Sequence, residues 1–148
     1  MGEKDPLFQE ETGGNYARNN ICVGIEYDSK QLVKNLKKYN LFQAKSGKEK
    51  PIDFNDEKLK KAYIRGMIDG DGHIPTHPKD HFKYIGSLDS CNYIKEYFNY
   101  PYKNNCKYIY QQDTLYTLQL SYNSIMPLLK ELYKDATIYL DRKYKIVM

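Results

Sequence analysis

Two aspartates separated by a glycine are the residues of this chain best suited to chemistry. The string Asp69-Gly70-Asp71-Gly72 ends a stretch with helical periodicity, so its carboxylates are expected at the C-terminal end of a helix. The helix macrodipole disfavours negative charge at that end, and a positive group should compensate. A divalent cation such as Mg²⁺ is the natural candidate, because hard cations prefer carboxylate oxygens and can activate water.

The helix that positions these aspartates is expected to begin at Asn55. Asn55 is placed as the N-cap, and Asp56 and Glu57 put negative charge into the first turn. Phe54 and Leu59 have the spacing of a hydrophobic staple around that cap. Small and apolar residues then recur on both sides of the helix, which predicts a central element with little surface left for water.

Gly66 and Gly70 lie four residues apart on one face of this helix. Each glycine in a helix interior costs roughly 1 kcal/mol relative to alanine. Such a cost is reasonable where another backbone must approach closely, so we expect a partner helix to pack against this face.

The segment Ile64-Arg65-Gly66-Met67-Ile68-Asp69-Gly70-Asp71-Gly72 resembles the LAGLIDADG motif of homing endonucleases and related intron maturases. Seven of its nine positions are identical or conservatively matched, and Arg65 stands in the usual small-residue place. Two plainer interpretations exist. An Asp-Gly-Asp-Gly string alone is often a turn, and an EF-hand loop would need a series of oxygen ligands and a closing Glu that are missing here.

The resemblance implies an α+β domain over residues 55–148, with the order α-β-β-α-β-β-α and helices on one face of a curved antiparallel sheet. The chain offers matching elements after the motif helix. They are two strands within Gly72–Gly86 around a turn near Pro78-Lys79-Asp80, a helix capped by Ser87 or Asp89, strands Cys106–Gln112 and Leu115–Tyr122 joined at Asp113-Thr114, and a helix from about Ser124 to Tyr133 leading into a basic tail.

The residues before the motif helix are expected to form two segments. Residues 1–19 lack periodicity and are expected to be a mobile leader. Residues 20–54 hold an alternating strand, a helix capped by Asp28 or Ser29, and a lysine-rich linker. Ile21–Ser29 aligns with Tyr116–Ser124, and Leu32–Leu36 with Leu128–Leu132. We therefore interpret 20–54 as the remnant of a first repeat plus a basic linker.

The resemblance assigns roles to residues near the end of the motif helix. Asp71 matches the metal ligand of the family, and Asp69 matches an aspartate that bonds nearby backbone. The position of Ser87 resembles that of a polar residue that positions water in the family. Arg142 or Lys143 lies where the family places a basic residue near the scissile phosphate. The family joins one acid from each of two motif helices around shared divalent metals, usually Mg²⁺.

This chain has one motif helix, so the resemblance implies a second one from outside it. A homodimer through the Gly66 and Gly70 face would supply it, as would a separately encoded chain.

Double-stranded DNA is the partner that the resemblance implies, and polar residues of the predicted sheet are its candidate contacts. Between Lys30 and Lys61 the chain has ten lysines against four acids, which is compatible with nucleic-acid binding and equally with a solvated face. A polar strand face is also ordinary solvent surface by default. The candidates for DNA binding are Lys45, Lys48, Lys79, Lys83, Lys107, Gln111, Thr117 and Gln119.

Three histidines, His73, His77 and His81, are spaced four residues apart and could suggest zinc on a helix. Pro75 and Pro78 exclude a helix there, so the histidines are expected to line the first hairpin instead.

Composition narrows the class of protein further. The chain has 148 residues, a formal net charge of +4 and three widely spaced cysteines, which indicates one main domain with free thiols in a reducing compartment. No leader or long apolar run suggests secretion or membrane insertion. We expect a soluble intracellular protein, in the cytoplasm, an organelle or a virus-infected host.

Two functions follow as hypotheses. The first is a site-specific, metal-dependent DNA endonuclease of LAGLIDADG homing type, serving intron or intein mobility and acting as a dimer. The alternative is an inactive module of the same fold that binds nucleic acid or a protein partner, as in a maturase or a regulator.

Overall fold

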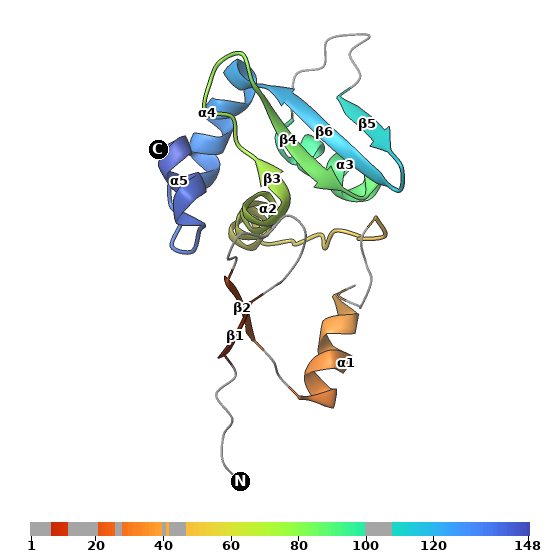
Figure 1. The fold of residues 1–148 in the computed structure, drawn as a ribbon. Helices are drawn as coiled ribbons and strands as arrows, with labels where there is room; N and C mark the ends of the chain where they lie inside the picture. The colour runs from red at the N-terminus through yellow and green to blue at the C-terminus, as the bar shows by residue number, and fades with distance from the viewer. Residues whose placement is uncertain (1–6, 12–20, 26–27, 40, 42–46, 100–107) are drawn as a thin grey trace.

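A four-stranded antiparallel sheet with helices packed on one face makes up the larger part of the structure, a computed structural model (Figure 1). It describes residues 7–11, 21–25, 28–39, 41, 47–99 and 108–148. Its elements are β1 Leu7–Glu11, β2 Ile21–Ile25, α1 Lys30–Lys38, α2 Glu57–Asp71, β3 Gly72–His73, β4 His81–Gly86, α3 Leu88–Tyr97, β5 Ile109–Gln112, β6 Leu115–Ser121, α4 Tyr122–Tyr133 and α5 Asp141–Val147.

The sheet order is β3-β4-β6-β5, and every neighbouring pair is antiparallel. Along β4, exposed and buried residues alternate, as expected for strands with one face on the core. The helices α2, α3 and α4 contact β4 on the buried side. A mixed α+β architecture with an antiparallel sheet is thereby confirmed.

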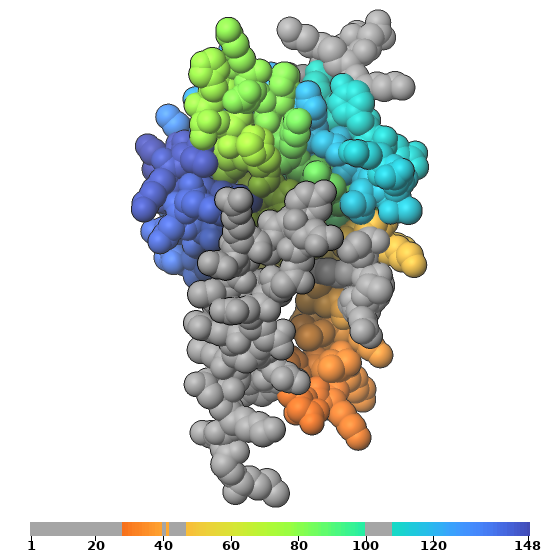
Figure 2. All heavy atoms as spheres, viewed as in Figure 1, coloured from red at the N-terminus to blue at the C-terminus, as the bar shows by residue number. Residues whose placement is uncertain are grey.

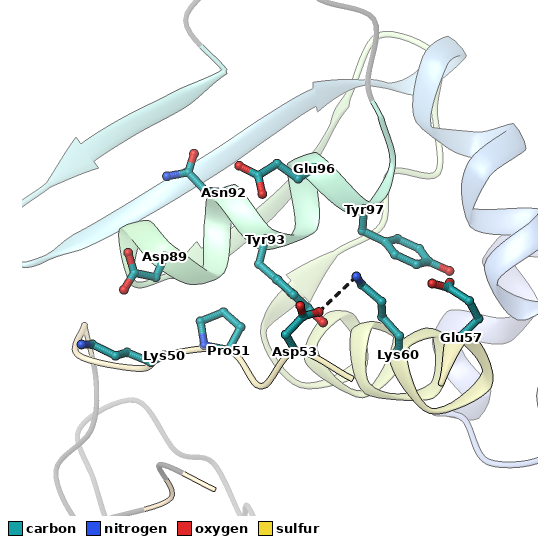
Figure 3. Close-up of a pocket in the computed structure, with 10 residues that line it drawn as sticks. All are labelled: Lys50, Pro51, Asp53, Glu57, Lys60, Asp89, Asn92, Tyr93, Glu96 and Tyr97. Atoms are coloured by element: carbon teal, nitrogen blue, oxygen red, sulfur yellow. Dashed lines mark hydrogen bonds and ion pairs between the residues drawn. The ribbon is translucent and has the colours of Figure 1, made fainter. Parts of the chain in front are cut away.

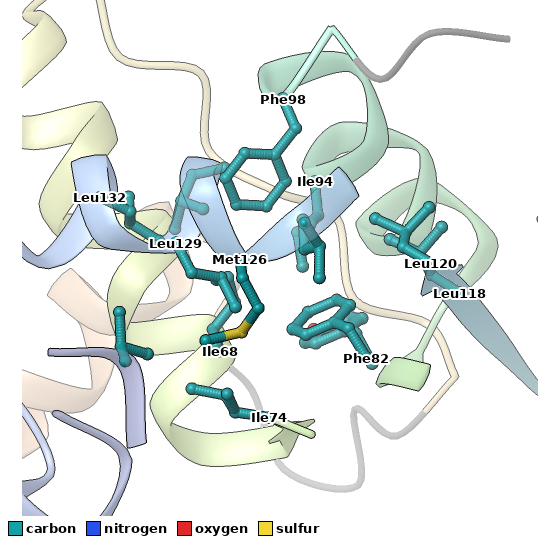
Figure 4. Close-up of a cluster of buried hydrophobic side chains, with 14 of the residues drawn as sticks. Ile68, Ile74, Phe82, Ile94, Phe98, Leu118, Leu120, Met126, Leu129 and Leu132 are labelled. Atoms are coloured by element: carbon teal, nitrogen blue, oxygen red, sulfur yellow. The ribbon is translucent and has the colours of Figure 1, made fainter. Parts of the chain in front are cut away.

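The core lies between this sheet face and the helices (Figure 4). Phe82 of β4 and Leu118 of β6 are fully buried, and so are Ile64 and Ile68 of α2. Burying a side chain of this kind contributes about 1.5 to 3 kcal/mol, so the cluster is the main source of stability. Every member of the core cluster falls between residues 64 and 147.

Several local signals are confirmed by the structure. Ser87 is the N-cap of α3, with its Oγ accepting a hydrogen bond from the Ser90 N–H. Asp113-Thr114 joins β5 to β6, since Gln112 pairs with Leu115, and Asp113 has a φ of 52°. Ser29 caps α1 and accepts from the Leu32 N–H.

Other predictions at element ends were wrong. Asp56, and not Asn55, caps α2, because its carboxylate accepts both the Lys58 and the Leu59 N–H, at 2.7 and 3.1 Å. The helix α4 begins at Tyr122 after its cap Ser121, two residues before Ser124. Each error is a shift of one or two residues in a capping position.

Two larger differences concern the ends of the chain. Residues 7–11, expected inside a mobile leader, form β1 and pair with β2 over five residues. The predicted basic tail contains α5, whose residues Lys143 and Val147 are buried. Strand pairing and burial are long-range contacts, and neither is visible in local periodicity.

Candidate site at the end of the central helix

Asp71 is the last residue of α2, and its side chain is exposed. Gly72 follows as the C-cap, and a Cβ at Gly72 would lie 2.6 Å from the Ile68 carbonyl oxygen, so only glycine fits this close turn. β3 begins at once and pairs Gly72 with Tyr84. Within the described residues no hydrogen bond or ion pair holds the Asp71 carboxylate.

The positive group at this helix end is Lys143 of α5. Its ammonium donates hydrogen bonds to the carbonyl oxygens of Ile68 at 2.6 Å, Asp69 at 2.7 Å and Gly72 at 2.5 Å. Lys143 is only 2% exposed. A buried lysine therefore satisfies the carbonyls that a helix C-terminus leaves open, and supplies the charge that its dipole favours.

The pKa of Lys143 is lowered below its usual value, first by burial and then by the nearby charge of Arg142. The charges of Asp69 and Asp71 act in the opposite direction. All three ammonium protons are used by backbone carbonyls, so Lys143 is not available to contact a substrate. Arg142, the other predicted basic residue, is exposed.

Asp69, which is negatively charged, also helps to hold this end of α2. Its Oδ1 accepts the Tyr133 hydroxyl at 2.6 Å, and its Oδ2 accepts the Leu140 N–H at 3.0 Å. Burial of Tyr133, helped by this hydrogen bond, raises the pKa of the phenol. The prediction that Asp69 bonds backbone rather than substrate agrees with this geometry.

Arg65 makes a third tie between α2 and the segment around α4 and α5. Its Nε donates to the Ile138 carbonyl at 3.0 Å, and a terminal nitrogen donates to the Leu132 carbonyl at 3.1 Å. The side chain is 7% exposed. Arg65, Asp69 and Lys143 together fix the second half of α2, and hence the place from which Asp71 projects.

The glycine face of α2, formed by Leu59, Ala62, Gly66 and Gly70, is exposed in the part of the chain that the structure describes. Leu59 is 55% exposed, and among described residues nothing lies within 4 Å of a Cβ built at Gly66 or Gly70. By helical spacing this stripe lies opposite the buried Ile64 and Ile68. A flat stripe without a charged residue permits close approach of another helix.

Ser87 occupies a structural position. Besides capping α3, its Oγ donates to the Glu49 carbonyl at 2.5 Å and lies 2.9 Å from the Ser90 Oγ. The side chain is 4% exposed. It thereby ties the segment before α2 to the end of β4, and its hydroxyl has local partners. Close by, one carboxylate oxygen of Glu49 is buried without a hydrogen-bond partner.

Three of the predicted DNA contacts share the outer face of the sheet. Lys83 pairs with Gln119, and Ile85 with Thr117, and directly opposed residues of an antiparallel pair point to the same side. Lys83 is exposed, and His73 pairs with it across β3. Lys79 is exposed in the turn between β3 and β4, and Lys48 is exposed before α2.

Gln111, another of the predicted DNA contacts, lies on the opposite face of the sheet. It pairs with Tyr116 on the core side, whereas Tyr110 pairs with Thr117 and is 47% exposed on the outer side. Ile109 takes the inward position opposite Leu118, because an isoleucine loses less by burial than a tyrosine with its hydroxyl. Lys45 and Lys107 lie outside the described residues.

A hollow lies between α2, α3 and the segment 50–53, away from Asp71 (Figure 3). It is an open groove of about 810 Å³. Lys60 bridges Asp53 at 3.2 Å within it, and the Tyr93 hydroxyl donates to the Ile52 carbonyl at 3.0 Å. The groove contains none of the residues predicted to act in catalysis.

The end of α2 can hold one ligand of a metal and cannot enclose the ion alone. The described residues contain no group of three or more His, Cys, Asp or Glu side chains able to hold a metal. Asp71 offers a free carboxylate, whose chemistry suits Mg²⁺. The remaining ligands would have to come from solvent, a substrate phosphate or a second carboxylate.

Comparison with known proteins gave no match to any family model, curated protein or solved structure. In the part of the chain that the structure describes, no helix is long and apolar enough to cross a membrane.

The sequence missed the two buried cations, Lys143 and Arg65. A signal for Lys143 was present, because it lies four residues before Val147 and would share that residue's inward face in a helix. Because the last residues were interpreted as a basic tail and not as a helix, this spacing was not used. For Arg65, its position directly after the core residue Ile64 indicates burial only once the neighbours of the helix are known.

Proposed function

We propose that this chain is a divalent-metal-dependent DNA endonuclease of LAGLIDADG type, which hydrolyses both strands of a specific duplex. The contrast between the two motif aspartates carries the proposal. Asp69 has both oxygens in hydrogen bonds, whereas Asp71 is exposed, and its carboxylate is held by no described neighbour. A free carboxylate at a fixed helix end is suited to hold a metal.

The second carboxylate would come from another motif helix packed on the glycine face. Gly66 and Gly70 are exposed there, so the backbone of a second α2 can approach closely and bring its own Asp71 alongside. A homodimer provides this helix directly, and a different chain with such a helix is the other source. Bound Mg²⁺ would activate water and stabilise the leaving oxygen.

Lys143 explains why one copy alone should bind the cation weakly. Its ammonium already neutralises the carbonyl groups at the C-terminal end of α2, so a single Asp71 carboxylate adds little net attraction for a second cation. Two Asp71 side chains brought together would provide enough negative charge to attract the metal ion. Metal binding should therefore depend on assembly of the two helices.

The duplex would lie on the outer sheet face, where Lys83, Thr117 and Gln119 share one side. Lys79 and Arg142 are exposed and can contact phosphates at its edges. Phosphate contacts of this kind make affinity fall steeply with salt.

An inactive binding module is the second candidate. The observation in its favour is that the described residues offer one free carboxylate and no metal-binding group at the end of α2. The fold and the outer sheet face would then serve binding alone.

The test uses a library of randomised duplexes incubated with the full chain and Mg²⁺, with sequencing of the cut ends. We expect cuts at one recurrent sequence, abolished in Asp71→Asn. Asp80→Asn, an exposed aspartate in the turn between β3 and β4, is the matched control and should cut normally. Salt-sensitive duplex binding without cutting would favour the module, and a fully active Asp71→Asn would exclude the proposed mechanism.

A further inference from the structure

The helix α1 has an apolar side that is exposed. Leu32, Val33 and Leu36 are 41%, 51% and 37% exposed, and α1 has no buried residue. Figure 2 shows α1, in orange, at the far end of the molecule from β4. Its lysines at 30, 34, 37 and 38 recur with helical spacing on the side away from Leu32 and Leu36. This pattern is typical of a surface helix that covers a core.

The same succession of elements occurs later in the chain with its surfaces covered. β1, β2 and α1 form an antiparallel hairpin followed by a helix, as do β5, β6 and α4. Leu129 and Leu132 of α4 are 0% and 2% exposed, and the sequence alignment matches them to Val33 and Leu36. A position that is buried in one unit is therefore open in the other.

The strands β2 and β6 also differ in how many of their edges are paired. β6 pairs with β5 on one edge and with β4 on the other. Among described residues, β2 pairs with β1 alone, so its second edge has no strand beside it. An isolated two-stranded sheet is marginally stable in water, and an open edge readily accepts another strand.

We infer that β2 and α1 form an interface between two copies of this chain. The open edges of two β2 strands pair about a twofold axis, which requires the antiparallel direction. The result is a four-stranded sheet in the order β1-β2-β2-β1. Leu32, Val33 and Leu36 of the two copies then cover one another.

A second copy suits this surface better than another part of the same chain. Its β2 edge and α1 face lack the same partners, so each copy supplies what the other needs. The lysines of α1 lie on the side away from Leu32 and Leu36, so like charges are kept out of the contact. β4 cannot serve as the partner strand, because β3 and β6 already occupy both of its edges.

The surface is small, and a weak dimer is expected. α1 is about 13 Å long and about 10 Å wide, and β2 adds an edge of about 17 Å. This is small beside the roughly 800 Å² per partner of a standard interface. The dimer should therefore be weak enough to dissociate on dilution. The inference concerns a surface separate from Asp71 and from the glycine face, so it stands apart from the proposed endonuclease.

The test is the mass of the chain carrying Gly66→Leu, which blocks the glycine face, in solution between about 1 µM and about 200 µM, by sedimentation or light scattering. We expect a twofold rise in mass with concentration. The double variant Val33→Asp, Leu36→Asp should lose that twofold rise, and the control Lys34→Gln on the opposite side of α1 should keep it. Thermal unfolding of each variant checks the core, which contains no residue of α1.

Hydrogen exchange gives a second measurement that does not depend on a variant. Amides of residues 21–25 and 30–38 should exchange more slowly at the higher concentration. A chain that remains at 17.5 kDa throughout overturns the inference. So does assembly that persists when the double variant is added to Gly66→Leu. Absence of DNA cleavage by the wild-type chain, with this concentration dependence intact, would count against the endonuclease alone.

Discussion

Replacing Lys143 with methionine tests whether a buried lysine holds the end of α2. Methionine keeps much of the side-chain length and removes the ammonium, which leaves the carbonyls of Ile68, Asp69 and Gly72 without their donor. Three hydrogen bonds from a charged donor would be worth roughly 1.5 to 3 kcal/mol each if nothing opposed them. The cost of burying the ammonium opposes them, and it is the reason that the pKa is lowered.

The net loss expected for Lys143→Met is about 3 kcal/mol of unfolding free energy, a large share of the 5 to 15 kcal/mol typical of a domain. Urea unfolding followed by circular dichroism measures it, with the slope of free energy against urea as the check on two-state behaviour. Lys145→Met is the control, because Lys145 is exposed on the same helix. It should change stability by less than about 0.5 kcal/mol.

The reasoning is refuted if Lys143→Met is as stable as the wild type. That result would mean that water or the rest of the chain satisfies the three carbonyls equally well. A fall in stability of the same size in Lys145→Met would also refute it, since the effect would then come from total charge.

Four further results are expected. Asp69→Ala should lose about 2 kcal/mol in urea unfolding, since it leaves the buried Tyr133 hydroxyl without an acceptor, whereas Asp71→Ala should leave stability unchanged. Ser87→Ala should lose about 1 kcal/mol by the same measurement, through its cap of α3. Because the pKa of Tyr133 is raised in the fold, its contribution is present below about pH 10 and is lost as the pH rises further; urea midpoints should fall there, less so in Tyr133→Phe. Burial raises the pKa of the Cys91 thiol to about 11, so iodoacetamide at pH 8 should label Cys91 only after unfolding, as peptide mapping will show.

Local signals located most of the elements around the site. The 3.6-residue period predicted α2, and the cap at Ser87 and the turn at Asp113 were visible because each depends on a residue and its near neighbours. Asp69 and Asp71 were assigned different roles; Asp69 accepts two hydrogen bonds, one of them from backbone as predicted, and the role of Asp71 stays a prediction.

Two of the misses involve contacts between distant parts of the chain. β1 exists through pairing with β2, and Lys143 is buried because α5 folds back onto α2. Gln111 faces the core side because the register of β5 on β6 puts it opposite Tyr116. A shift of one residue moves every side chain of a strand to the other face, so register cannot be predicted from alternation alone where tyrosines fit either side.

The ties between α2 and α5 also bear on the order of folding. Lys143 reaches carbonyls 71 to 75 residues earlier in the chain, and Arg65 reaches 67 to 73 residues ahead. Closing loops of that length costs conformational entropy, which the new hydrogen bonds offset only once they are formed. These hydrogen bonds should therefore form late, after α2 has packed on β4. During synthesis the end of α2 must wait for α5 to leave the ribosome. The place from which Asp71 projects is therefore among the last parts of the molecule to become fixed.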